Sequence, residues 1–181
     1  MKRVPSVRAA LTLALSTGVT GCQSRAKPEA PYSYVVTMEP FEEFHFEEGD
    51  WVAYVFLERG SYEELKGVLP GSCLVLKDRA QLAAGLSELA FGPPSGADVA
   101  TVISSLALVR DGRLVYQTNV LLEGRGPDGL QSRAYGWVPS VPEGALREFV
   151  KRFQAIRAED VVPRHLAESP HTPCIVGGTA L

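Results

Sequence analysis

The first group of residues that could support chemistry is Glu43-x-His45-x-Glu47. Side chains alternate between the two faces of a β-strand, so a strand here would place all three on one face. A carboxylate–imidazole–carboxylate row can bind a metal ion or hold a histidine that transfers protons. The alternative is a solvent-exposed polar face, which is common on antiparallel sheets. We favour this alternative and predict no metal site here.

A second group lies near the C-terminus, where His165, Glu168, His171 and Cys174 are spaced by three. Prolines between them favour a polyproline II helix, whose three residues per turn would align the four side chains. Two imidazoles, a carboxylate and a thiolate could bind zinc, but the spacing matches no known zinc pattern. We therefore predict no metal site in this segment either.

Recognised catalytic motifs are missing from the sequence. It contains no phosphate-binding loop, no H-E-x-x-H, no C-x-x-C and no EF-hand loop. The segment 92–96 lacks the G-x-S-x-G spacing, and its prolines oppose a nucleophile turn. We predict no catalytic residue and no cofactor, and favour a protein that is not an enzyme. The alternative is an envelope hydrolase or metal-binding enzyme whose site is assembled from residues distant in sequence.

The N-terminus has the features of an export signal. Three basic residues precede an apolar run from Ala9 to Val19, which ends in Val19-Thr20-Gly21-Cys22. This segment resembles the lipobox signal peptide of bacterial lipoproteins. The resemblance implies that residues 1–21 are a signal peptide, that Cys22 carries lipid such as palmitate, and that the protein is anchored in the cell envelope.

Two other interpretations of this segment are a transmembrane anchor and an ordinary cleaved signal. The apolar run is about half of the roughly 20 residues that span a bilayer. An ordinary signal favours small residues at −3 and −1 of its cleavage site, whereas Val19 fits the lipobox better. Gln23 is not the Asp that holds enteric lipoproteins at the inner membrane, so the resemblance implies the outer membrane, facing the periplasm.

Two cysteines remain once Cys22 is assigned to lipid. They are Cys73 and Cys174, an even number in an oxidising compartment. We therefore predict a disulfide between them. The alternative is two separate buried thiols.

Length and charge predict one soluble domain. Removing residues 1–21 leaves 160 residues, and the net charge falls from −3 to −6 because the signal carries three basic and no acidic residues. We expect residues 22–33, which are polar and proline-containing, to form the lipidated cysteine and tether, and residues 34–181 to form the domain. A net negative domain without a basic cluster is a poor nucleic-acid binder.

The acidic residues are unevenly distributed. Nine carboxylates stand against one Arg between Glu39 and Glu64, whereas residues 147–157 contain four Lys or Arg. Such a bias could steer a basic partner to the domain. The alternative is a pair of solvated faces that keep the domain soluble.

The first half of the domain contains several β-prone runs. Residues 44–46 and 51–57 flank Glu48-Gly49-Asp50, which predicts a hairpin with a short glycine-containing loop. Residues 51–57 are apolar on both faces, as in a central strand. Residues 34–38 and 73–76 predict two further strands.

Three helices are predicted from polar caps that precede apolar residues at helical spacing. The caps are Ser61-x-x-Glu64, Asp78 with Gln81, and Ser140-x-x-Glu143. Pro70 ends the first helix, the segment 92–96 ends the second, and the third carries apolar residues from Leu146 to Ile156.

The strongest local signal is a hairpin of residues 101–109 and 114–122. Asp111-Gly112 between them suits a type I′ turn, in which both central residues have positive φ. This turn predicts cross-strand pairs, namely Val109 with Leu114, Leu108 with Val115, Ala107 with Tyr116 and Leu106 with Gln117. Residues 131–138 predict one more strand.

Adjacent hairpins rather than strict βαβ alternation predict the α+β class, a largely antiparallel sheet with about three helices packed on it. Together these patterns favour a lipid-anchored envelope lipoprotein that acts as a protein-binding or accessory module. An immunity protein against an exported toxin is one version of this function. We expect an envelope protein as partner, the membrane as anchor, and no nucleic acid.

Overall fold

Eight strands form one antiparallel sheet in the part of the chain that the computed structural model describes. Their order across the sheet is β3-β7-β6-β5-β4-β1-β2-β8. All described residues belong to the unit 34–181. They are residues 39–94, 104–124, 126–132, 136–157, 159–160, 162, 166, 175–176 and 179–180.

Helices and strands do not follow a regular alternation along the chain. The sheet strands are β1 (Trp51–Phe56), β2 (Cys73–Leu76), β3 (Ala90–Phe91), β4 (Ser105–Arg110), β5 (Arg113–Leu121), β6 (Gly129–Ser132), β7 (Gly136–Val141) and β8 (Gln154–Ala155). The helices are α1 (Arg59–Leu65), α2 (Arg79–Ser87) and α3 (Ala145–Val150). A separate pair consists of β9 (Ile175–Val176) and β10 (Thr179–Ala180).

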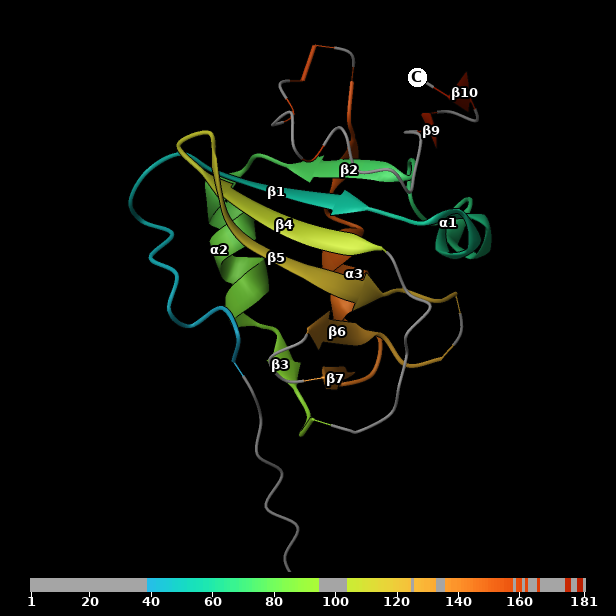
Figure 1. Cartoon of the computed structure of the whole chain (residues 1–181), viewed down its shortest axis with the longest axis horizontal. Coiled ribbons are helices and arrows are strands. Elements are labelled where there is room, and N and C mark those ends of the chain that lie inside the picture. The colour runs from blue at the N-terminus through green and yellow to red at the C-terminus, as the bar shows by residue number, and fades with distance from the viewer. Residues whose placement is uncertain are drawn as a thin grey trace, which may run out of the picture. The chain divides into compact units, whose positions relative to one another are not determined.

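The larger apolar core lies on the helix face of the sheet. It combines alternate residues of the central strands with buried side chains of all three helices, such as Leu65, Leu82 and Phe149. Figure 1 shows α2 and α3 behind the same face of the sheet. The expected largely antiparallel sheet is therefore confirmed, in a sheet-rich domain with three short helices in its described part.

The opposite face of the sheet carries a second, smaller core. Tyr54, Phe56 and Val75 belong to it, and Ile156 and Leu166 from beyond β8 join them. Burial raises the pKa of the Tyr54 phenol. Both faces of β1 are therefore covered, as its uniformly apolar sequence predicted.

The predicted hairpin of residues 44–46 with 51–57 is wrong. Strand β1 pairs with β4 over its whole length and with β2 from Ala53 to Phe56, whereas residues 44–46 join no strand. Residues 40–43 instead form turns, and Phe41 and Phe46 are buried in the core of the helix face. Residues 34–38, predicted as a strand, lie outside the described residues.

The β4–β5 hairpin is confirmed at its turn and shifted beyond it. Asp111 has φ 50° and Gly112 φ 75°, and Val109 pairs with Leu114 as predicted. A β-bulge between Leu108 and Val109 then moves every later pair by one residue, so Leu108 pairs with Tyr116 rather than Val115. Tyr116 consequently packs against the helix-face core, while Val115 is exposed.

The helix caps are only partly as predicted. Asp78 caps α2, because its Oδ1 accepts a hydrogen bond from the Gln81 amide at 3.0 Å. That bond lowers the pKa of the Asp78 carboxyl. Helix α1 is capped by Glu58 rather than Ser61, since Glu58 Oε1 accepts from the Ser61 amide at 2.6 Å. Ser61 is thus the third residue of the helix and not its cap.

Helix α3 takes its cap from a residue remote in sequence. Ser140 lies in β7, so the predicted Ser140–Glu143 box is wrong. The fully buried Asp128 accepts hydrogen bonds from the Gly144 amide at 2.7 Å and the Arg147 amide at 2.6 Å. It also accepts one from the Ser140 hydroxyl. One carboxylate therefore fixes the start of α3 against the end of β7.

Two further boundaries differ from the predictions. Residues 129–132 and 136–141 form two strands, β6 and β7, rather than a single strand over 131–138. Helix α3 ends at Val150, because Gln154 and Ala155 pair with β2 as the edge strand β8. This crossing of the sheet edge carries Ile156 to the second core.

Replacing Asp128 with Asn should destabilise the domain strongly. In this variant a neutral amide replaces the buried carboxylate that accepts hydrogen bonds from three donors. The weaker hydrogen bonds should lower the free energy of unfolding by about 3 kcal/mol. Equilibrium urea unfolding measures this loss. Glu143→Gln is the matched control and should change the value by less than about 0.5 kcal/mol, since Glu143 is exposed. Equal losses in the two variants would contradict the remote cap.

Candidate functional site

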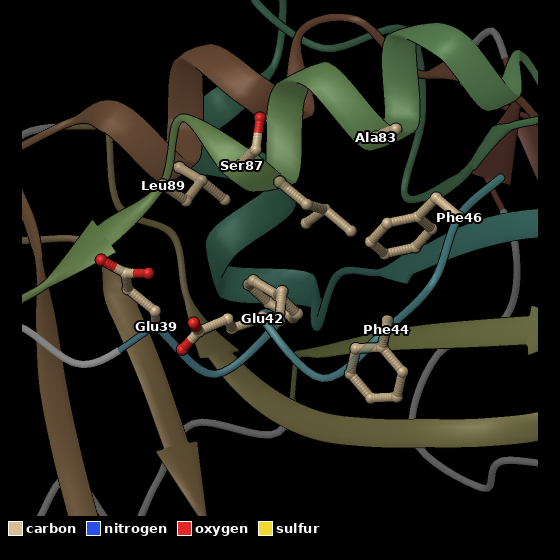
Figure 2. A pocket seen from close by; sticks show the side chains of 9 residues that line it. Glu39, Glu42, Phe44, Phe46, Ala83, Ser87 and Leu89 are labelled. Carbon is tan, nitrogen blue, oxygen red and sulfur yellow. The ribbon is translucent and has the colours of Figure 1, made fainter.

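A groove of about 270 Å³ lies between helix α2 and the chain that precedes β1. We name residues 39–50 the acidic segment, because they contain six carboxylates and no Lys or Arg. Figure 2 shows Glu39 and Glu42 at one end of the groove, with Phe44 and Phe46 toward the other. The groove is lined by Glu39, Phe41, Glu42, Phe44, Phe46, Ala83, Leu86, Ser87 and Leu89.

Tight turns and aromatic packing position the wall formed by the acidic segment. The Glu42 amide donates to the Glu39 carbonyl, and the Phe44 amide donates to the Phe41 carbonyl, both at 3.1 Å. The ring of Phe46 lies 4.8 Å from that of Trp51, a distance typical of a favourable aromatic pair. The aromatic wall is therefore held to the sheet rather than free in solvent.

Strand β5 adds a second support to this wall. The Tyr116 ring lies 5.6 Å from Phe41 and 5.5 Å from Phe44, in edge-to-face geometry. Tyr116 reaches this position only because the bulge at Val115 places it on the core face. The indole of Trp51 also donates to the Glu48 carbonyl at 2.6 Å, which fixes the end of the acidic segment.

Helix α2 forms the facing wall and leaves room for an occupant. Leu86 and Leu89 are buried, whereas Ala83 is half-buried and Ser87 is exposed. Ala83 has only a methyl group where a larger side chain would extend into the groove. The wall is therefore apolar at its base and open at its rim.

The charges around the groove are poorly neutralised. Glu39, Glu42 and Glu43 are exposed, and none of them forms an ion pair with another described residue. Glu48 is paired with Arg110 at 3.2 Å, and the Arg79 guanidinium donates to the Glu47 carbonyl at 3.2 Å. The groove thus combines an apolar interior with free negative charge at its mouth.

The row Glu43-x-His45-x-Glu47 does not form on a strand. It lies in the turns of the acidic segment, and the side chain of His45 is 74% exposed. Its Nδ1 lies 3.7 Å from Glu47 Oε1. In the described ranges no three His, Cys, Asp or Glu side chains gather closely enough to hold a metal ion. Glu43, His45 and Glu47 are exposed, but they do not lie on the solvent-facing strand that the sequence predicted.

The nine carboxylates between Glu39 and Glu64 do not form one surface. The six-residue strand β1, about 20 Å long, separates the acidic segment from the three carboxylates at α1. Of these three, Glu58 caps α1 and Glu64 accepts a hydrogen bond from the Gly124 amide at 3.1 Å. Only the acidic segment is therefore a coherent source of negative charge.

Three of the four basic residues of 147–157 are paired with acidic neighbours, and the fourth, Arg147, donates to the Glu123 carbonyl at 2.7 Å. Lys151 pairs with Glu148 at 2.6 Å, Arg152 with Glu88 at 2.8 Å and Arg157 with Glu159 at 3.8 Å. A polar pocket of about 350 Å³ beside them is closed at one side by an ion pair of Lys77 with Asp160. The hydrogen bond from the Arg157 amide, and to a smaller extent the one from the Lys77 side chain, lowers the pKa of the Asp160 carboxyl.

Of the three cysteines predicted to be modified, only Cys73 lies among the described residues. Cys73 is fully buried in β2, on the second face of the sheet. Cys22, Cys174 and the other predicted tail ligands, His165, Glu168 and His171, lie outside the described residues. Lipidation at Cys22 and the pairing of Cys73 with Cys174 stay predictions.

Thiol counting tests the predicted disulfide. The lipidated chain, purified from membranes and denatured without reductant, should show no alkylated cysteine, and reduction should expose two. Mass spectrometry of the alkylated peptides identifies the residues. Two modified cysteines before reduction would show that Cys73 and Cys174 are separate thiols.

Comparison with protein families, curated proteins and solved structures finds no match for this chain. No helix in the described ranges is both long enough and apolar enough to cross a membrane. The candidate site therefore has to be interpreted from its own geometry.

Proposed function

We propose that the chain is a lipid-anchored lipoprotein of the bacterial envelope whose domain binds a basic protein partner through the acidic segment. The carrying observation is the set of exposed carboxylates at Glu39, Glu42 and Glu43, which form no ion pair with another described residue, the first two of which line an apolar groove. Interfaces commonly combine a small apolar centre with a polar rim. The lipobox supports the anchor, and Gln23 supports the outer membrane facing the periplasm.

Electrostatics would act mainly on the rate of association. Six carboxylates in twelve residues, with Arg110 and Arg79 as the nearby cations, favour the approach of a positively charged surface. Exposed ion pairs add little to final affinity, so the charge would select and steer the partner while the apolar groove holds it.

We also infer that the domain belongs to the α+β class. Support comes from the antiparallel pairing throughout the sheet and from the three helices that share one core on one of its faces. We also propose the boundaries predicted from the sequence, namely a signal peptide over residues 1–21, a lipidated cysteine and tether over residues 22–33, and a domain over residues 34–181.

Substitution of Cys22 with Ala should release the protein from the membrane. Without the thiol no acyl chains can be attached, and several chains are what makes such an anchor stable. Metabolic labelling with palmitate followed by membrane fractionation measures both effects. Continued labelling of the variant, with retention in the membrane fraction, would contradict lipidation at this residue.

Neutralising the acidic segment should slow partner association. The triple variant Glu39→Gln, Glu42→Gln and Glu43→Gln should lower the association rate about ten-fold at low salt and flatten its salt dependence, because the steering charge is lost. The partner is first captured from envelope extract with the full chain and identified by mass. Surface plasmon resonance at low and high ionic strength then measures the rates.

The matched control carries Glu63→Gln, Glu143→Gln and Glu159→Gln. All three are exposed and lie outside the acidic segment, so the net charge changes equally. This control should keep most of the wild-type rate. If both triple variants behave alike, only the net charge matters and the acidic segment is not the binding site.

A further inference from the structure

We propose that the groove between the acidic segment and α2 is an anchor pocket for one large apolar side chain, presented by a partner segment that carries Lys or Arg beside it. This inference rests on the proposed function and specifies the chemistry that the site selects. The occupant is a basic, apolar peptide segment of a protein.

The size of the groove supports a single side chain. Its volume of about 270 Å³ is somewhat below the roughly 300–1,000 Å³ of pockets that enclose drug-sized ligands. An apolar cavity of about 150 Å³ already holds benzene. The groove is therefore large enough for a phenylalanine or leucine side chain, together with part of the backbone that carries it.

The lining fits an apolar occupant at depth. Phe41, Phe46 and Leu86 are buried, and the buried Leu89 also lines the groove. Their positions are fixed by core packing, so little ordering would accompany binding, and preorganisation of this kind favours affinity. An apolar side chain that enters the groove would exchange water for contacts with aromatic and aliphatic carbon.

The mouth of the groove fits a cation. Glu39 and Glu42 line it, are exposed, and have no ion pair within the described part of the chain. A Lys or Arg next to the apolar anchor could reach either carboxylate while its own stem covers the rim. Phe44, which is half-buried, lies toward the other end of the groove (Figure 2).

The same two carboxylates disfavour other occupants. An anionic lipid headgroup or an acidic peptide would face uncompensated repulsion at the mouth. A neutral apolar segment would fill the groove but leave the carboxylates without a partner. Charge complementarity therefore selects a basic segment among possible proteins.

The test uses three fluorescein-labelled, end-capped peptides and the full chain in non-ionic detergent. Their sequences are Lys-Lys-Phe-Lys-Lys, Lys-Lys-Ser-Lys-Lys and Glu-Glu-Phe-Glu-Glu. Fluorescence anisotropy should show the first binding about ten-fold or more tightly than the second, and the third not binding. Equal binding of the first two peptides would overturn the anchor pocket.

Filling the groove should remove this preference. Ala83→Leu places a larger side chain in the groove and should weaken the Phe peptide about ten-fold while leaving the Ser peptide unchanged. Gln81→Leu is the matched control, because Gln81 is exposed on the same helix and lines neither the groove nor the hollow beside it. If Ala83→Leu lowers the melting temperature of the protein, Ser87→Leu replaces it in the test, because Ser87 is exposed and also lines the groove.

The outcomes separate this inference from the proposed function. If Ala83→Leu leaves Phe-peptide binding unchanged while the triple Gln variant still slows the captured partner, the anchor pocket is wrong and the acidic surface remains. If the full chain instead self-associates, as measured by sedimentation, and Ala83→Leu abolishes this, the occupant is a second copy and the peptide proposal is overturned.

Discussion

The pairing of β1 on both of its edges is the constraint on which the rest of the described structure depends. Strand β4 pairs with all six residues of this strand and β2 with its last four, so the backbone of residues 53–56 is paired on both sides within the sheet. The acidic segment that precedes it does not join the sheet. It turns onto the helix face instead, where Phe41 and Phe46 bury their side chains.

The groove is a consequence of this arrangement. The acidic segment carries alternating aromatic and acidic residues, and only the aromatic ones can be buried without cost. The carboxylates consequently stay at the surface, next to the apolar side chains that anchor the segment. Because Ala83 of α2 is small, the two walls do not close on one another. An apolar hollow beside exposed carboxylates results from this packing.

The sequence predicted those features that depend on local signals. The Asp111-Gly112 turn, the Asp78 cap and the buried strand β1 each follow from short-range backbone chemistry, and each is observed. The predictions from sequence were wrong where contacts between residues distant in sequence determine the structure. The bulge at Val115 shifts the register and thereby places the Tyr116 ring against Phe41. The sequence of the turn alone does not predict that contact.

The site was predictable only in part. The acidic composition of residues 39–50 pointed to the segment that forms one wall of the groove, but the alternation of Glu43, His45 and Glu47 suggested a strand that does not form. Helix α2 as the second wall could not be predicted, since contact between it and the acidic segment depends on the sheet. The capping role of Asp128 was hidden for the same reason, because its partners lie up to nineteen residues away.

The central claim is that a partner protein contacts the acidic segment. The most direct measurement is photo-crosslinking in living cells, with a benzophenone amino acid introduced at Glu43 in one strain and at Val115 in another. Both positions are exposed, and Val115 lies on β5 outside the groove lining. The account predicts a specific protein adduct from position 43 that is absent from position 115. An adduct from position 115 alone, or the same adducts from both positions, would contradict it.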